Sequence, residues 1–367
     1  MVRGFKPPFF RRTKKSESLI KDRKRTGVVL SGGFYHGAFQ IGALLRLTEE
    51  SIPIFYIVGS SVGAVNGAAL SIGKVPQAVH TWRMITQEDI FQFNTVKFIR
   101  ETLRNVKSGG LGPDGIFDHT PLRELFRNFG RPEDIIASPI PLDIITTNLQ
   151  KREKEVFSSR DPRIARDPER IEEAILASCA IPIFFKPVVI DGCQYLDGGI
   201  VDNAPLSHAI KAGCDTIIFI DVSSSGGMIV RQKDRKRTLA LPKEPQEFHG
   251  FNSIGLVVAE ILTRTALEYD IRRAGEVNED IEAFDAFRSW VLARHPLSSQ
   301  QDHEQLKSYE ARFSFLKKKK VQIVVVKPER LLPALSPFGK IDRDAIDGMI
   351  EYGYKLTGTV FKKAHLI

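Results

Sequence analysis

Residues 54–73 form a run of twenty residues without a charged side chain, and this run constrains the fold more than any other part of the chain. An uncharged run of that length can cross a membrane as a helix. It nevertheless contains four glycines, three serines and Asn66, and it starts directly after Pro53. A buried strand followed by a helix of small residues, both inside an α/β core, therefore explains the run better than a transmembrane helix.

The same run contains the pentapeptide GSSVG, which places Ser61 between two glycines at the end of the expected strand. One interpretation is a tight turn, in which glycines let a strand and a helix pack closely. The other is a nucleophile elbow, in which the turn lifts a serine hydroxyl to the edge of the sheet so that it can attack a carbonyl carbon. Because turns rich in glycine and serine are common, the pentapeptide alone leaves both interpretations open.

From Thr26 onward, short β-branched runs alternate with segments whose apolar residues have helical spacing. Strands separated by helices predict an α/β fold with a mostly parallel central sheet and helices on both faces. Two regions break the alternation, and we expect loops at residues 105–118 and 223–250, the second followed by a long helix over 251–274. The pattern predicts strands at residues 26–31, 54–59, 142–148, 155–159, 215–222 and 321–328, and helices at 37–50, 61–72 and 167–178.

Positive charge is concentrated at the start of the chain. Residues 1–25 contain ten Lys or Arg and two acidic residues, so they account for +8 of the net charge of +9. The rest of the chain is close to neutral, which argues against a nucleic-acid-binding domain. The tail also interleaves Phe5, Phe9 and Phe10 with its cations, which suits an anionic membrane surface, although a solvated tail explains it equally well.

We therefore expect a basic, disordered tail over residues 1–25 and one domain over residues 26–367, with a loop-plus-helix insertion around 223–320. The three cysteines form no Cys-x-x-Cys pair, and no apolar signal core follows Met1. These features favour a cytoplasmic protein that can associate peripherally with membranes. No loop of the EF-hand type calls for calcium, and we expect neither a cofactor nor a metal.

A second glycine-rich turn, LSGGFYHGAFQIGAL at residues 30–44, again leads from a strand into a helix. Backbone N–H groups at such a turn, next to the positive end of a helix, suit an anion such as a phosphate or the oxyanion of a tetrahedral intermediate. A nucleotide site is not favoured, because neither the Gly-x-Gly-x-x-Gly nor the P-loop pattern is present. A glycine turn without a ligand remains the alternative.

Two acidic turns lie downstream in PVVIDGCQYLDGG, a predicted hairpin that turns at Asp191 and is followed by a second turn at Asp197. An aspartate before glycines is by itself most often a turn former. Its functional interpretation is a carboxylate base held on a rigid turn. The usual base for a serine nucleophile is histidine, and the pattern nominates none of the eight histidines but does not exclude His208 or His295.

Taken together, three segments resemble those of patatin-like phospholipases: the turn at residues 32–37, GSSVG, and LDGGIVDNAP at residues 196–205. Residues 175–192 resemble the segment that leads to the catalytic aspartate of this family, and residues 324–354 resemble its closing strand and helix. The resemblance covers roughly residues 26–222 and 321–360. It implies a three-layer α/β sandwich and acyl transfer through an acyl-serine intermediate.

The resemblance further implies a Ser–Asp dyad, with Ser61 as the nucleophile and Asp197 as the base that later activates the deacylating water. Backbone N–H groups of Gly32, Gly33 and Phe34 would form the oxyanion hole. The remaining expected site residues support the elbow and the acidic turn, and they are Gly59, Gly63, Gly198 and Gly199.

The oxyanion turn departs from the family pattern, which commonly has a third glycine where this chain has Phe34 and Arg or Lys where it has His36. A third residue with positive φ would make phenylalanine costly there. His36 would be a cation only below its pKa near 6.5. We expect a lipid acyl hydrolase that acts on phospholipid or neutral-lipid esters at membrane surfaces and is attracted to anionic lipid through its basic tail. The alternatives are a catalytically impaired protein of this fold that binds lipid or a partner, and a histidine-dependent hydrolase.

Overall fold

The computed structural model describes residues 24–90, 92, 95–107, 115–222, 275–294, 299–310, 320–333 and 341–367. Almost all of the expected basic tail lies outside the described residues, as do the loop at 223–250 and the predicted long helix over 251–274.

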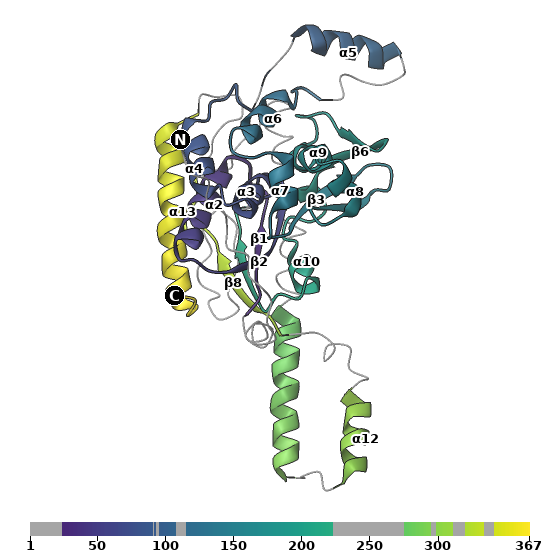
Figure 1. The fold of residues 1–367 in the computed structure, drawn as a ribbon, viewed down its shortest axis with the longest axis vertical. Helices are drawn as coiled ribbons and strands as arrows, with labels where there is room; N and C mark the ends of the chain where they lie inside the picture. The colour runs from purple at the N-terminus through teal and green to yellow at the C-terminus, as the bar shows by residue number, and fades with distance from the viewer. Residues whose placement is uncertain are drawn as a thin grey trace, which may run out of the picture.

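A mixed sheet of eight strands forms the centre of the described chain (Figure 1). Its order is β5-β6-β3-β2-β1-β7-β8, and β4 pairs with β3 beside this path. The strands β3, β2, β1, β7 and β8, which are neighbours in this order, are parallel to one another. Strands β4 and β6 run antiparallel to β3, and β5 runs antiparallel to β6. The strands are β1 (Thr26–Leu30), β2 (Ile54–Ser60), β3 (Leu142–Asn148), β4 (Glu153–Ser158), β5 (Val188–Ile190), β6 (Cys193–Asp197), β7 (Thr216–Ile220) and β8 (Gln322–Val326).

Helices cover both faces of this sheet, as the alternation of strands and helices predicts. On one face lie α2 (Gly37–Glu49), α3 (Val62–Ser71), α4 (Val75–Met84), α9 (Glu169–Ser178) and α13 (Arg343–Lys363), and on the other lies α10 (Leu206–Lys211). The other described elements are η1 (Phe34–His36), α5 (Thr95–Lys107), α6 (Thr120–Arg127), α7 (Pro132–Ala137), α8 (Pro162–Arg166), η2 (Gly198–Ile200) and α12 (Gln300–Glu310), and residues 275–294 are also helical.

The central strands are buried on both faces, which is why they consist of β-branched and other apolar residues. Along β1, Val28 and Leu30 pack in the core below α2 and α3, and Val29 between them packs in the core below α10. The three-layer α/β sandwich is therefore confirmed. Residues 54–73 are β2 and α3, as predicted, and among the described residues no helix combines the length and apolar character that crossing a bilayer requires.

Two segments lie at opposite ends of the sheet (Figure 1). The helix over 275–294 and α12 extend beyond the end where β8 begins, whereas α5 and α6 lie beyond the carboxyl ends of the parallel strands. The predicted loop at 105–118 is wrong at its start, because α5 continues to Lys107. The physical reason is the helical spacing of its apolar residues Val96, Ile99, Leu103 and Val106, which extends up to that point.

Candidate active site

Ser61 sits on a sharp turn between β2 and α3. Its backbone has φ 54° and ψ −130°, a conformation that costs a non-glycine residue about 1–3 kcal/mol. The two flanking glycines allow the turn, because a Cβ on Gly59 would lie 2.3 Å from the Gly63 carbonyl oxygen, and one on Gly63 would lie 2.4 Å from the Leu30 carbonyl oxygen. Strand, turn and helix therefore have the geometry of a nucleophile elbow, which a simple tight turn does not require.

The side chain of Ser61 meets Asp197 at the end of β6. The Ser61 hydroxyl donates a hydrogen bond of 2.7 Å to Asp197 Oδ2, and the Gly199 N–H donates one of 2.7 Å to Oδ1. The backbone of Asp197 is fixed as well, since its carbonyl accepts a 2.7 Å hydrogen bond from the Thr147 hydroxyl on β3. Gly198 lies against the Ile145 carbonyl oxygen, where a Cβ would be 2.1 Å away. Sheet pairing thus brings together two residues from distant parts of the sequence.

Burial changes the acidity of Asp197. Its removal from water raises its pKa to about 7, and the hydrogen bonds from Ser61 and Gly199 offset only part of that increase. A carboxyl group with this pKa exchanges its proton near neutral pH, as a general base and acid must. The arrangement can accept the Ser61 proton and return it to a leaving group.

Ser178, at the end of α9, holds the backbone of Ser61 in place. Its hydroxyl accepts a 2.8 Å hydrogen bond from the Ser61 N–H and donates one of 2.7 Å to the Ile145 carbonyl on β3. The strained turn is thereby tied to the centre of the sheet. Sequence reasoning missed Ser178, and the only available signal was its place in the segment that leads to Asp197.

The glycine-rich turn reaches the same site from the end of β1, but one predicted oxyanion donor needs correction. The Gly32 N–H already donates a 2.7 Å hydrogen bond to Asn203 Oδ1, and both groups are buried. Gly32 therefore connects the turn to the Asp197 segment, and among the described residues no hydrogen-bond partner is found for the Gly33 N–H. Asn203 was overlooked, although it belongs to the quoted LDGGIVDNAP motif.

Phe34 and His36 show what the departures from the family pattern do. Phe34 has φ 54°, so the position is one that favours glycine and the phenylalanine backbone is strained. Burial lowers the pKa of His36, against the effect of hydrogen bonds to the backbone of Pro333 and Val222. At neutral pH His36 is therefore an uncharged residue that joins the turn to the segments following β7 and β8, rather than a cation.

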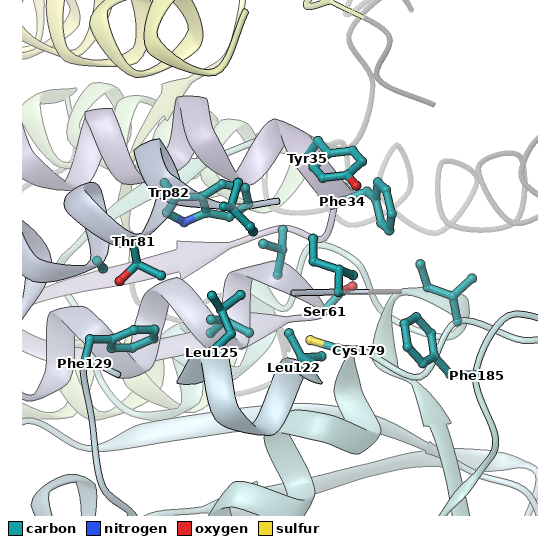
Figure 2. Close-up of a pocket in the computed structure, with 16 residues that line it drawn as sticks. Phe34, Tyr35, Ser61, Thr81, Trp82, Leu122, Leu125, Phe129, Cys179 and Phe185 are labelled. Atoms are coloured by element: carbon teal, nitrogen blue, oxygen red, sulfur yellow. The ribbon is translucent and has the colours of Figure 1, made fainter. Parts of the chain in front are cut away.

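Ser61 faces an apolar pocket with about 660 Å³ of space, part of it continuous with solvent (Figure 2). Its wall next to Ser61 is formed by Phe34, Tyr35 and Cys179, and α6 contributes Leu122 and Leu125. The opposite side of α6 is held by Arg123 and Arg127, which both form ion pairs with the fully buried Glu172 on α9. The other lining residues are Val62, Val65, Ala78, Thr81, Trp82, Ile85, Ile90, Phe129, Ile181 and Phe185.

The histidine-dependent alternative finds no support in this geometry. The Ser61 hydroxyl donates its hydrogen bond to Asp197, and His208 lies on α10 near Lys154 and Asp202. Burial lowers the pKa of His208. His295 lies outside the described residues. Among the residues that the structure describes, no group of three or more His, Cys, Asp or Glu could hold a metal ion.

A family model described as patatin-like phospholipase matches residues 28–210, a range that includes Ser61, Asp197 and both glycine-rich turns. The chain belongs to the patatin-like phospholipase family. This is a family of carboxylic-ester hydrolases, and the resemblance inferred from the motifs is confirmed.

Three curated relatives illustrate the similarity. An uncharacterized NTE family protein of Mycobacterium tuberculosis is 27% identical over 201 residues, which are 55% of this chain and 50% of that protein. A probable lipid hydrolase of Invertebrate iridescent virus 6 is 28% identical over 52% of this chain and 66% of its own length. Lysophospholipase nte1 of Aspergillus terreus is 28% identical over 55% of this chain and 12% of its own length. The match thus spans about half the length of the mycobacterial relative.

Among solved structures, VipD from Legionella pneumophila aligns with 93% of this chain and 67% of its own chain, at 13% sequence identity and a TM-score of 0.43.

Proposed function

We propose that this protein is a serine acyl hydrolase of lipid esters, of the phospholipase A or lysophospholipase type, that uses a Ser61–Asp197 dyad. The observation that carries the proposal is the 2.7 Å hydrogen bond from the Ser61 hydroxyl to a buried carboxylate, on a strained elbow that faces an apolar pocket. The names of two relatives, a lysophospholipase and a probable lipid hydrolase, support the class of substrate.

The reaction begins when Ser61 Oγ attacks the ester carbonyl carbon while its proton passes to Asp197. The tetrahedral intermediate places its negative oxygen at the turn before α2, where N–H groups of Gly33 and Phe34 at the start of η1 are the proposed donors. The intermediate collapses, the bond to the leaving alcohol breaks, and that alcohol takes the proton from Asp197. Water then attacks the acyl-serine with Asp197 as base, which releases the fatty acid and restores Ser61.

The pocket suggests which part of the substrate lies where. Its walls are almost entirely apolar, so an acyl chain gains from burial there at roughly 25 cal/mol per Å² of apolar surface removed from water. The polar part of the lipid then remains toward solvent, at the side of the Ser61 hydroxyl. Action at a membrane surface, where such substrates are found, is part of the proposal.

Hydrolysis of a short-chain aryl ester tests the dyad without a choice of lipid. Wild type, Ser61→Ala, Asp197→Asn and an empty-vector preparation are compared, with Ser71→Ala as a matched control in a buried serine at the far end of α3. We expect activity in wild type and Ser71→Ala and background rates in both dyad variants. Equal rates in wild type and Ser61→Ala would contradict the proposal and favour a catalytically impaired protein that binds lipid or a partner. The strained backbone at Phe34 would then be the structural reason for the lost activity.

A further inference from the structure

Helix α5 packs against the rest of the molecule with its polar side and presents its apolar side to solvent. Val96, Ile99, Leu103 and Val106 are 67%, 52%, 59% and 55% exposed. At 100° per residue these four lie in one stripe along the helix. The opposite side contains the buried Glu101, with the partly buried Thr102 and Asn105 beside it. A helix that only stabilised the fold would be oriented the other way round.

The orientation is fixed by specific contacts. Glu101 forms an ion pair with Lys186, which lies in the segment before β5. Phe98, the apolar residue that faces inward, lines a small cavity together with Phe117 and Lys186. The ring of Phe117 lies 6.1 Å from that of Phe185, which lines the Ser61 pocket. One chain of contacts therefore joins the inner side of α5 to the pocket wall.

The outer side of α5 combines its apolar stripe with positive charge. The thirteen residues of the helix include four Lys or Arg and one Glu, and that Glu is the buried one. Arg100, Arg104 and Lys107 are exposed and lie beside the apolar stripe, on one flank of it. Apolar side chains next to long basic ones match an anionic lipid surface, into which the former insert while the latter reach the phosphate groups.

The position of α5 agrees with such a role. It lies beyond the carboxyl ends of the parallel strands (Figure 1). Ser61 directly follows one of these strands, β2. Phe287 and Trp290 are also exposed, but they belong to the helix over 275–294, which extends from the opposite end. A membrane that touched that helix would lie away from the pocket.

We propose that α5 is a membrane-docking helix, whose outward apolar stripe enters an anionic bilayer surface and brings the mouth of the Ser61 pocket to the lipid. The inference rests on the proposed function for its purpose, but lipid binding is tested separately from catalysis. It gives the described part of the chain a membrane contact that does not involve the basic tail of residues 1–25.

The test measures vesicle binding of the full chain in a Ser61→Ala background, so that lipid stays intact, and ester hydrolysis in the background with Ser61. Vesicles contain phosphatidylcholine alone or mixed with phosphatidylserine. The apolar variant is Ile99→Ser with Leu103→Ser, and the charge variant is Arg100→Gln. The matched control is Phe287→Ser with Trp290→Ser, which removes exposed apolar side chains from the other end of the molecule. Thermal unfolding shows whether each variant is folded.

We expect the apolar variant to lower binding to anionic vesicles by roughly tenfold or more, and the charge variant to lower it by a smaller factor. The control should bind as wild type does. Short-ester hydrolysis should stay the same in all of them, and hydrolysis of vesicle lipid should fall with binding. Wild-type binding by the folded apolar variant would overturn the inference, and an equal loss in the control would do so too.

The two proposals fail in different ways. If the protein binds anionic vesicles through α5 but hydrolyses no ester, the docking helix stands and the proposed function is wrong. If it hydrolyses the short ester but binds vesicles independently of Ile99 and Leu103, the proposed function stands and the docking helix is wrong. In the second case a protein partner would be the occupant of the stripe to examine next.

Discussion

Ser61 and Phe34 both have φ of 54°, and both face the same pocket. The strain at Ser61 belongs to the elbow, which places the hydroxyl within 2.7 Å of Asp197. The strain at Phe34 belongs to the glycine-rich turn. Its ring makes an edge contact with Tyr35, with centroids 4.5 Å apart, and forms part of the pocket wall. The unfavourable backbone at Phe34 is thus accompanied by a side chain that shapes the site.

Replacing Phe34 by glycine separates these two effects. We expect Phe34→Gly to relieve backbone strain and to leave kcat for a short ester unchanged within a few fold, because the backbone N–H remains. KM for long-chain esters should rise, since the pocket loses part of its wall. Phe34→Ala is the control, because it removes the same ring without relieving φ, and it should be less stable than Phe34→Gly by about 1 kcal/mol. A drop in short-ester kcat of a hundredfold in both variants would show that the ring itself holds the turn in place.

Asp197 sets the expected pH dependence. Because the base must be ionised to accept the Ser61 proton, kcat/KM for the short ester should rise with pH and level off above about 7, the pKa that burial gives this carboxyl group. The same shift has the opposite sign for stability. The folded state binds this proton more tightly than the unfolded state does, so the contribution of Asp197 to stability falls as pH rises from about 4 to about 7.

Two measurements check this. A pH–rate profile that is flat between pH 5 and 8, in roughly the range where Asp197 titrates, would exclude Asp197 as the base with this pKa. Thermal unfolding of Asp197→Asn compared with wild type should show the variant gaining stability relative to wild type as pH is raised, because it has no buried charge to accommodate. An unchanged difference between pH 5 and 8 would contradict the assigned burial effect.

At the scale of elements, α13 packs against α2, and the proposed oxyanion turn lies directly before α2. The two helices approach so closely that a Cβ on Gly353 would lie 2.0 Å from the Phe39 carbonyl oxygen. Gly348 is in the same helix, and a Cβ there would meet nothing within 4 Å. The same substitution at these two positions therefore has opposite expected results.

We expect Gly353→Ala to lower the free energy of unfolding by roughly 2 kcal/mol or more, because α13 must move away from α2. Gly348→Ala should raise it by about 0.5–1 kcal/mol, since alanine loses less backbone entropy in a helix. Urea unfolding measures both. The short-ester rate of Gly353→Ala should fall as the oxyanion turn shifts. If both variants unfolded as wild type does, the close crossing of the two helices would be incorrect.

How far the sequence predicts these elements depends on the range of the interaction. The strands, α2, α3 and α9 follow from local periodicity. The glycines around Ser61 predict a turn, but only the backbone geometry distinguishes an elbow from a simple tight turn. Asn203 and Ser178 could not be found in this way, because their partners Gly32 and Ser61 lie 171 and 117 residues away. Helix α5 has clear periodicity, but only the structure shows that its apolar stripe faces outward.

At the scale of the whole molecule, the proposed catalytic site and the proposed docking helix lie at one end. Ser61 follows the carboxyl end of β2, and α6 contributes Leu122 and Leu125 to the pocket. Helix α5 lies beyond this end of the sheet (Figure 1). The net charge of +9, of which residues 1–25 contribute +8, makes attraction to an anionic surface possible over a distance of about 10 Å at moderate salt. Substrate presented in a bilayer and substrate free in solution should therefore respond differently to ionic strength.

Raising the salt concentration should lower the rate on anionic vesicles severalfold and leave the rate on the short-chain ester nearly unchanged. The reason is that salt screens the attraction between anionic lipid and the basic residues of the tail and of α5. The buried Ser61–Asp197 pair is little affected. Parallel rate measurements on both substrates across a salt series provide the test, with neutral vesicles as the control. If the short ester lost activity in the same proportion, salt would be acting on the site, and electrostatic docking would not explain the rate on membranes.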